Sequence, residues 1–452
     1  MNLPDYFLAD LPAEASLTPD LITQACLTLK RNRHRFLLER TTSQLIETIR
    51  DAVDHWLHGT DPFLTRALSG SLSINGDALE AGLRNFFKKI TADSLETVLL
   101  RELGSHGLIE LTRPLVPPRD AVFPRLLRGP ELLAHWVSDQ LPVSAFTRLI
   151  YGILARSAQF IRCPPQSSLL VRLFAHSLYR VEPKLGACLE VAEWAENQGA
   201  LNQSLLGGAD AFVLAGSEKV LQDWRSRTPG GVRFVGLQQG VSFGFVSRDA
   251  VGDRPESDAV SDAGRDVIHW NQLGGQAPDV FYIQENDWLN ARAFAELLAQ
   301  RLASLESKCP RGPVDAETVR TIERRRSFYQ TRARHDSDTQ VWESQESTAW
   351  TVVYESDPQF QFSCRHRFIY VKPVKELQQA TAAALEKSKV LCTVGLAAGL
   401  DRARLMAQEL TRWGVQRICP LGQMLDPPLT SASDDGLRFA DLVNYTDFEF
   451  PG

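Results

Sequence analysis

The chain has 452 residues, of which 44% are hydrophobic and 23% charged, and its formal net charge is −6 at pH 7. This composition is typical of a globular protein, and the length predicts more than one domain. The acidic balance disfavours a general nucleic-acid or anionic-membrane surface, and no apolar run reaches the roughly 18 residues that a membrane span needs. Acidic residues near the N-terminus, in MNLPDYFLADLPAE, argue against a signal peptide, so we expect a cytoplasmic protein.

The predicted helices and strands are distributed unevenly along the chain. Residues 17–104 carry apolar residues at spacings of three and four, which predicts a mostly helical region. The Pro-rich segment 113–131 breaks this pattern and predicts a crossing into the next domain. From 132 to 246 short apolar runs alternate with helical patterns, which predicts a parallel, doubly wound sheet. Residues 247–265 are polar, largely acidic and without periodicity, so we expect a solvated loop or linker, followed by a second αβ section.

Metal and disulfide chemistry find no support in the sequence. The seven cysteines are scattered and form no CxxC pair, which is typical of reduced thiols. The nine histidines form no HxxxH or HExxH pattern, so we expect no metal site. The Arg-rich segment 320–334 is best interpreted as a charged helix face, with a phosphate or acidic-partner patch as the alternative.

Two glycine-containing segments are candidates for ligand contacts. Gly216 and Ser217 lie between a predicted strand and a predicted helix, where backbone N–H groups can face a phosphate or a ribose. The simpler interpretation makes Ser217 an N-cap. Gly244, within the strand-like SFGF run that begins at Ser242, indicates a bulge or the close approach of a ligand.

The stretch WNQLGGQAPDVFYI, residues 270–283, is built like many active-site loops. Its two glycines let the backbone approach a ligand closely, and Pro278 fixes the loop. No residue of the stretch is an obvious nucleophile or base.

A series of stretches in fixed order extends from about residue 130 to the C-terminus. These stretches are LIYGILARSAQFIRC, GGADAFVLAGSEKVLQDWRS, VRFVGLQQGVSFGFV, GRDVIHWNQLGGQAPDVFYI, CPRGPVDAETVRTI, WTVVYESDP, RFIYVKPVKEL and GVQRICPLGQMLDPPLTSASDDGLRFADLVNYTDFE. In this order they resemble the long-chain fatty acyl-CoA reductases of the bacterial bioluminescence (lux) operon type, which belong to the aldehyde dehydrogenase superfamily.

The resemblance implies an aldehyde dehydrogenase-like α/β fold, with two doubly wound α/β domains, a helical N-terminal region and a small bridging extension. On this chain it predicts a helical region at 1–125 packed on the first α/β domain, a dinucleotide-binding-type domain at 126–258 and a catalytic-type domain at 259–423. The extension, 424–452, is expected to return to the first domain or to a partner subunit.

The resemblance also implies a reaction. Such enzymes take a fatty acyl group from a thioester onto a cysteine and reduce it with NADPH to the aldehyde. This chemistry needs a thiolate nucleophile and hydrogen-bond donors that stabilise an oxyanion. The implied partners are an acyl-protein synthetase, an active reductase or an acyl carrier, within a homo- or hetero-oligomer.

The family's catalytic positions differ in this chain. The nucleophilic cysteine aligns with Gly275, because Gln272 and Pro278 keep the register of the family's loop. The oxyanion-binding asparagine aligns with Gln140, and Gln276 is a second candidate donor.

The predicted cofactor-binding residues are also carried over by alignment. The family's lysine that faces the cofactor ribose or its phosphate aligns with Arg162. Gly216, Ser217, Ser242 and Gly244 complete the set.

The sequence thus predicts a reductase-fold protein with a degenerate active site that acts as a binding or regulatory partner. Two alternatives stay open. One is a working reductase that uses a noncovalent mechanism or another thiol, although the positions of Cys309 and Cys364 in the sequence do not suggest that either reaches the 271–278 loop. The other is a purely structural subunit.

Overall fold

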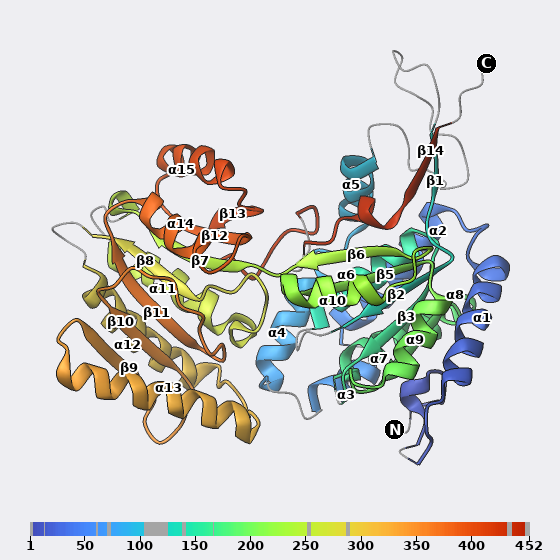
Figure 1. The fold of residues 1–452 in the computed structure, drawn as a ribbon, viewed down its shortest axis with the longest axis horizontal. Helices are drawn as coiled ribbons and strands as arrows, with labels where there is room; N and C mark the ends of the chain where they lie inside the picture. Colours follow the sequence, from blue (N-terminus) through green and yellow to red (C-terminus); the bar gives the residue numbers. More distant parts are fainter. Residues whose placement is uncertain are drawn as a thin grey trace. The chain divides into compact units, whose positions relative to one another are not determined.

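The computed structural model describes residues 3–12, 14–59, 62–69, 74–103, 125–137, 142–165, 167–250, 255–285, 290–431 and 436–447. The chain divides into two compact units (Figure 1). Unit 1 comprises Met1–Gly70, Arg84–Gln238 and Pro428–Gly452, and unit 2 comprises Ser71–Leu83 and Gln239–Pro427. The division at 238/239 differs from the boundary expected at 258/259.

The predicted helical region is confirmed in residues 17–104. Its helices are α1 (Pro19–Phe36), α2 (Thr42–Leu57), α3 (Pro62–Ser69), α4 (Gly76–Phe87) and α5 (Ala92–Leu103). The N-cap Thr18 accepts a hydrogen bond from the Leu21 N–H at the start of α1, and Thr41 and Gln44 form a capping box at the start of α2. None of the described helices is long and apolar enough to cross a membrane.

Unit 1 contains a five-stranded parallel sheet in the order β4-β3-β2-β5-β6. Its strands are β2 (Leu132–Trp136), β3 (Ala158–Cys163), β4 (Leu189–Glu193), β5 (Ala211–Gly216) and β6 (Arg233–Gln238). Its helices are α6 (Pro142–Leu154), α7 (Leu169–Val181), α8 (Pro183–Gly186), α9 (Gly199–Gly208) and α10 (Glu218–Arg227). The chain winds outward from β2 in both directions, so the predicted doubly wound sheet is confirmed over these strands.

Unit 2 contains a seven-stranded sheet in the order β13-β12-β7-β8-β11-β10-β9. Its strands are β7 (Val241–Val246), β8 (Val280–Gln284), β9 (Thr339–Glu343), β10 (Thr351–Glu355), β11 (Phe368–Val374), β12 (Leu391–Ala397) and β13 (Arg417–Pro420). Only β9 pairs antiparallel among these strands. Because β7 pairs with β8 and β12, it belongs to this sheet, which is why the domain division falls before it.

Two apolar layers cover the two faces of this sheet. One layer contains buried residues of α11 (Pro255–Ile268) and α12 (Ala291–Lys308). The other contains buried residues of α13 (Ala316–His335), α14 (Leu377–Leu385) and α15 (Leu400–Arg412). Alternate strand residues contribute to the two layers, as the two-residue period of a strand requires.

The prediction of a loop over residues 247–265 is wrong from residue 255 onward. Helix α11 occupies this region and buries Ala259, Ala263 and Val267 at a spacing of four residues. The face is narrow and partly made of alanine, and the residues between are mostly charged or polar. The helical period was therefore weak in the sequence.

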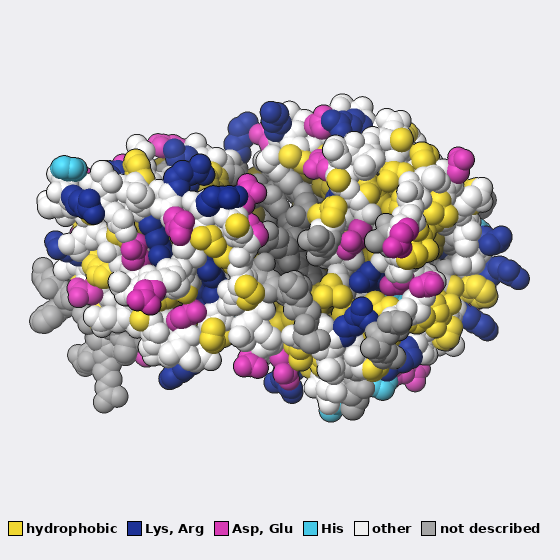
Figure 2. Space-filling model, turned by 90° about the horizontal axis from the view of Figure 1, so that it is seen from below, with side chains coloured by type: hydrophobic (Ala, Val, Ile, Leu, Met, Phe, Trp, Pro, Cys, Tyr) yellow, Lys and Arg dark blue, Asp and Glu magenta, His cyan; other side chains and the backbone are white. Residues whose placement is uncertain are grey.

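The Arg-rich segment is a helix face, as predicted, but half of its arginines make tertiary contacts. Arg326 is buried and donates to the carbonyl oxygens of Ser347 and Trp350, while Arg332 pairs with Glu355. Figure 2 shows basic and acidic side chains interspersed over the face that it draws, which is typical of a solvated surface.

A separate two-stranded antiparallel sheet joins β1 (Arg125–Arg128) to β14 (Asn444–Asp447) in unit 1. This pairing brings the described C-terminal residues back to the chain that precedes β2. The Pro-rich segment that we expected to cross between domains lies largely outside the described residues, which begin again at residue 125.

We predict that Asp266 makes the stability of unit 2 depend on pH. Burial raises the pKa of this carboxyl to about 7, although it accepts hydrogen bonds from the Gly422 and Met424 N–H groups. The folded protein therefore binds this proton more tightly than the unfolded chain does. This contribution to the free energy of unfolding is complete at acidic pH and is lost as the pH rises through about 7.

Asp266→Asn removes the titration. We expect the free energy of unfolding of the variant, relative to the parent, to rise between about pH 5 and about pH 8 in urea titrations. Asp258→Asn, an exposed position on the same helix, is the control. A difference between Asp266→Asn and the parent that stays constant with pH would show that Asp266 does not titrate in this range.

Candidate functional site

Segments from four parallel strands of unit 2 meet at the amino ends of those strands. The 269–279 loop precedes β8, and its Gly275 carbonyl accepts a hydrogen bond from Ser242 Oγ of β7 at 3.3 Å. The same hydroxyl accepts from the Thr393 N–H of β12 at 3.2 Å. Arg365, just before β11, donates to the Gly274 carbonyl at 2.8 Å. The predicted active-site loop therefore lies in a polar cluster that the sheet assembles.

The 269–279 loop contains three consecutive non-glycine residues in the left-handed region. Trp270, Asn271 and Gln272 have φ values of 51°, 50° and 64°. Such residues are strained by about 1 kcal/mol or more each and persist only where surrounding contacts hold them. Trp270 packs so closely on Gly82 that a Cβ there would lie 2.6 Å from the indole ring. The Gln272 Nε2 group donates to the carbonyl oxygens of Pro278, at 2.7 Å, and Phe368, at 3.0 Å.

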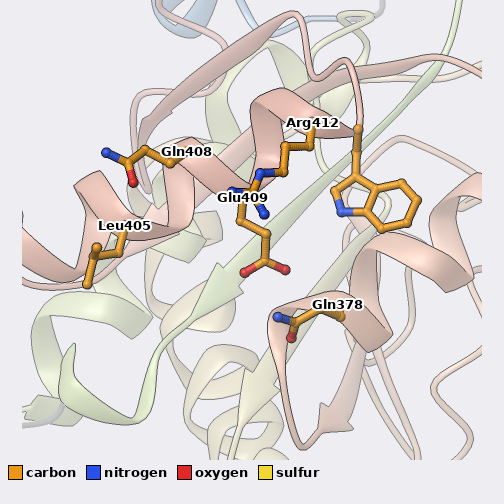
Figure 3. A pocket seen from close by; sticks show the side chains of 6 residues that line it. Gln378, Leu405, Gln408, Glu409 and Arg412 are labelled. Carbon is orange, nitrogen blue, oxygen red and sulfur yellow. The ribbon is translucent and has the colours of Figure 1, made fainter.

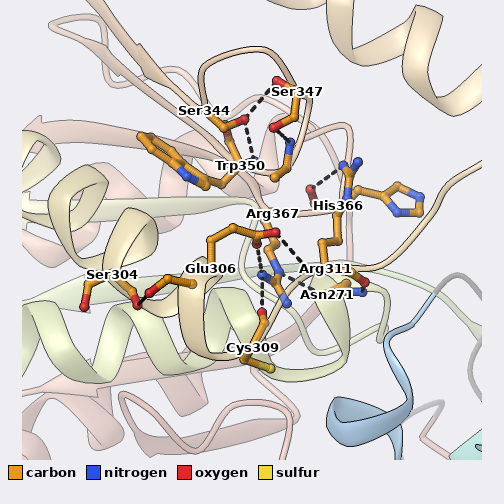
Figure 4. Close-up of polar contacts among 12 residues, drawn as sticks. Asn271, Ser304, Glu306, Cys309, Arg311, Ser344, Ser347, Trp350, His366 and Arg367 are labelled. Carbon is orange, nitrogen blue, oxygen red and sulfur yellow. Dashed lines mark hydrogen bonds and ion pairs between the residues drawn. The ribbon is translucent and has the colours of Figure 1, made fainter.

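A buried guanidinium holds Asn271 (Figure 4). Arg367 donates from Nε to Asn271 Oδ1 at 2.8 Å, and its other end contacts Glu306 at 2.5 Å and the Cys309 carbonyl at 2.9 Å. Burial lowers the pKa of Arg367, and Glu306 opposes that shift. Arg367 therefore connects the loop to the C-terminal end of α12. The dipole of this helix also favours a cation at that end.

A second arginine, Arg311, also contacts Asn271. Arg311 donates from NH1 to the Thr348 carbonyl at 2.6 Å and from NH2 to the Thr348 hydroxyl at 3.0 Å, and its own carbonyl accepts from Asn271 Nδ2 at 2.9 Å. Burial lowers the pKa of Arg311 to about 10, so it stays charged at neutral pH.

Gly275 is exposed, whereas residues 276–279 and Gly274 are buried. The nucleophile position predicted from the sequence therefore lies at the surface of an otherwise enclosed loop. The neighbouring Gln276 is 4% exposed, and its carboxamide oxygen accepts from Arg417 NH1 at 2.7 Å. That oxygen is engaged in holding the loop to the segment after β13, since Arg417 also donates to the Gln423 carbonyl at 2.7 Å.

The two candidates on β7 have structural contacts. Ser242 joins the loop to β12, as described above. At Gly244 the close neighbour is the Phe281 ring, which would lie 2.4 Å from a Cβ at that position. The strand pairing is regular at Gly244, so no bulge is present there, and the packing of Phe281 accounts for the glycine.

The candidates in unit 1 lie at the carboxyl ends of its strands. Gly216 ends β5, and Ser217 is the N-cap of α10, accepting from the Val220 N–H at 3.4 Å. Gln140 lies outside the described residues. Gly216 and Ser217 therefore place the N-terminus of α10 directly after β5, and helix N-termini generally favour anions.

Arg162 is enclosed by aromatic rings. Its guanidinium carbon lies 3.8 Å from the centroid of the Trp136 ring and 5.9 Å from the centroid of the Trp194 ring. The NH2 group of Arg162 donates a hydrogen bond to the Trp194 carbonyl. Burial lowers the pKa of Arg162 to about 10, and the residue is 2% exposed. The side chain is therefore charged at neutral pH but turned into the protein.

Two cysteines lie next to residues that contact the loop or its supports, although no contact of either thiol with the loop is observed. Cys364 stands between Ser363, which accepts from Gln272 Nε2 at 3.4 Å, and Arg365, which donates to two loop carbonyls. Cys392 precedes Thr393 in β12, where the pairing register with β7 shifts. Burial raises the pKa of both thiols, although Arg365 opposes the shift at Cys392, so neither is an activated thiolate.

Comparison with known proteins gives one family match and many fold matches. The family model described as acyl-CoA reductase (LuxC) matches residues 37–444. No curated protein matches this chain. The solved structures establish an aldehyde dehydrogenase-like fold and, at 12–14% identity, no more than the fold.

Three of these structures illustrate the match. A mutant of the P. syringae indole-3-acetaldehyde dehydrogenase AldA, in complex with NAD+ and IAA, has a TM-score of 0.71 and 13% identity over 96% of this chain and 89% of that chain. A putative aldehyde dehydrogenase, PutA, from Anabaena variabilis has a TM-score of 0.69 and 13% identity over 96% and 93%. Bifunctional proline utilization A has a TM-score of 0.71 and 14% identity over 96% of this chain, which spans 45% of that protein.

We predict that Arg365 fixes the 269–279 loop. Arg365→Met removes the donors to the Gln272 and Gly274 carbonyls, so the free energy of unfolding should fall by about 1–2 kcal/mol. Amide hydrogen exchange within residues 272–276 should accelerate by a larger factor than exchange elsewhere in unit 2. Arg265→Met, at an exposed arginine that pairs with Asp262 one turn earlier on α11, should change stability by less than about 0.5 kcal/mol. Unchanged exchange in the loop would contradict this role.

Proposed function

Since the chain belongs to the acyl-CoA reductase (LuxC) family, we propose that it is a degenerate member whose nucleophile position is occupied by Gly275. It acts as a binding or regulatory partner in fatty acyl processing. Its partner is an active reductase, an acyl-protein synthetase or an acyl carrier. The observation that supports this proposal is an exposed glycine in a loop that is held by contacts from Ser242, Arg365 and Arg367.

The family reaction passes an acyl group to a cysteine before reduction. A glycine has no side chain that can form the thioester, and the loss of covalent catalysis is complete. The adjacent Gln276 does not replace it, because a carboxamide is not a nucleophile of this kind and its oxygen is bound by Arg417. A polar, strained and well-supported loop without its nucleophile is consistent with a retained binding function.

NADPH is the hydride donor that the family implies, and a structurally similar dehydrogenase was solved with NAD+. In unit 1, the surroundings of Arg162 do not fit the contact to the cofactor ribose or phosphate that the resemblance implies for this residue. Arg162, which aligns with that contact, is held between Trp136 and Trp194 and is 2% exposed. We therefore assign no hydride-transfer step to this chain.

A working reductase is the competing function, and one observation favours it. Cys364 and Cys392 are each adjacent in sequence to a residue that contacts the 269–279 loop or its Ser242 support, namely Ser363, Arg365 and Thr393. Burial raises the pKa of both thiols, which weighs against them as nucleophiles. A noncovalent reaction or a purely structural subunit has no comparable support.

Restoring the thiol tests the proposal. We expect Gly275→Cys to acquire a covalent acyl adduct at residue 275 when the protein is incubated with a long-chain acyl-CoA. The adduct should form at least about ten-fold faster than at a control cysteine, because the loop orients the group. Gly230→Cys is the matched control, since a Cβ there meets nothing within 4 Å. Equal labelling at both positions would show that the loop is not a preserved acyl site.

Arg162 gives a separate prediction about the cofactor. We expect the apparent affinity for NADPH, measured by titration of the tryptophan fluorescence, to be the same in the parent and in Arg162→Met. The reason is that the guanidinium faces Trp136 and Trp194. The substitution should instead lower the free energy of unfolding by about 1–3 kcal/mol. Saturable NADPH binding in the parent that weakens about ten-fold or more in Arg162→Met would identify a charge-assisted phosphate contact and contradict the prediction.

A further inference from the structure

The outer face of helix α13 in unit 2 carries a row of three exposed side chains. Arg320, Arg324 and Phe328 are spaced by four residues, which places them on one face of the helix on successive turns. Phe328 is 58% exposed, and the two arginines are also exposed. Unlike Arg326 and Arg332 of the same helix, neither of them makes an ion pair or a hydrogen bond with the described residues. The row therefore presents two positive charges and an aromatic ring to solvent.

A second exposed aromatic ring lies on the segment beside this helix. Phe362 is 50% exposed, and it follows Gln361, whose carboxamide oxygen accepts a hydrogen bond from the Tyr329 hydroxyl of α13. Among the described phenylalanines, only Phe328 and Phe362 are exposed. Large apolar side chains are normally buried, so their exposure on two neighbouring segments indicates a contact surface.

We call Arg320, Arg324, Phe328 and Phe362 the α13 patch. Its basic and aromatic parts adjoin each other, because Arg324 is close enough to the segment that follows Phe362 to affect Cys364. Burial raises the pKa of the Cys364 thiol, and Arg324 is among the groups that oppose this shift. Arginine and aromatic side chains are the types that are enriched in protein–protein interfaces.

The charges around the patch select the kind of partner. Glu317 and Glu323 are exposed on the two sides of the arginine row, and the whole chain has a net charge of −6. A nucleic acid or an anionic membrane presents negative charge over a wide area and would meet these carboxylates as well as the arginines. A protein helix can instead place its carboxylates opposite the arginines alone.

We propose that the α13 patch binds an acidic helix of a partner protein. That helix offers two carboxylates four residues apart to Arg320 and Arg324, and a large apolar side chain that packs on Phe328 and Phe362. The spacing matches because the row on α13 also repeats every four residues. This inference concerns the outer side of α13, and it does not depend on whether the 269–279 loop is active.

The contact is small and partly electrostatic. A patch of four side chains is well below the roughly 1,600 Å² of a standard stable interface, so binding is weak and reversible. Because the arginines are exposed, salt screens their attraction for carboxylates. Weak, salt-sensitive binding is therefore expected of the full-length protein.

A short stapled helical peptide is the probe, with two glutamates four residues apart and a leucine four residues further on. Fluorescence anisotropy at low salt should show saturable binding to the full-length protein. Arg320→Glu/Arg324→Glu should weaken this binding about ten-fold or more, because it places like charges opposite one another. Phe328→Ser should also weaken it about ten-fold, because it removes an aromatic contact. A peptide with lysines in place of the glutamates should bind the double arginine variant and not the parent.

Arg412→Glu is the matched control. Arg412 is an exposed arginine of α15, which covers the same side of the sheet, and it lines a separate cavity of about 530 Å³ together with Glu409 and Trp413 (Figure 3). Its reversal should leave the affinity for the peptide unchanged, and circular dichroism checks that each variant is folded.

Three results would each overturn the proposal. The first is that the parent does not bind the peptide at low salt. The second is that Arg412→Glu weakens binding as much as Arg320→Glu/Arg324→Glu does. The third is that a single-stranded oligonucleotide binds through these two arginines more tightly than the peptide, which would identify a nucleic-acid surface instead.

Discussion

The geometry of the candidate site depends on the buried guanidinium of Arg367. This side chain connects the C-terminal end of α12 to Asn271, the central residue of a left-handed run that would be unfavourable on its own. Burying such a charge is costly unless it is paired and hydrogen-bonded, and here Glu306 and the Cys309 carbonyl supply those contacts. Arg367 itself belongs to a second left-handed run, Arg365–Arg367. Two strained segments therefore contact each other through the Arg367 side chain.

This support surrounds the position at which we propose that the nucleophile has been lost. Strained backbone at an active site is normally part of the preorganisation of a catalytic group. Here the loop presents the Gly275 backbone at the surface, while its neighbours remain buried and bonded to Ser242, Arg365 and Arg417. Our proposal also rests on Arg162, whose guanidinium is enclosed by the Trp136 ring and donates to the Trp194 carbonyl. We interpret the chain as a reductase scaffold whose chemistry has been lost while its loop architecture persists.

The sequence predicted the parts of the fold that depend on short-range patterns. The helices between residues 17 and 104, the doubly wound sheet of unit 1 and the family all follow from periodicity or from ordered stretches, and the structure or the comparisons confirm them. Helix α11 was missed because its buried face is narrow and partly alanine. The convergence of Ser242, Arg365 and Thr393 on the loop could not be predicted either. These residues are far apart in the sequence, and only the strand order brings the amino ends of β7, β8, β11 and β12 together.

The central claim is that the wild-type chain forms no acyl-enzyme. The most direct test is intact-mass spectrometry of the purified protein after incubation with a long-chain acyl-CoA, followed by peptide mapping without reducing agent. The account predicts an unmodified mass, because Gly275 offers no thiol and burial raises the pKa of the thiols of Cys364 and Cys392. A stoichiometric acyl adduct mapped to Cys364 or Cys392 would contradict the account and identify the chain as a reductase with a relocated nucleophile.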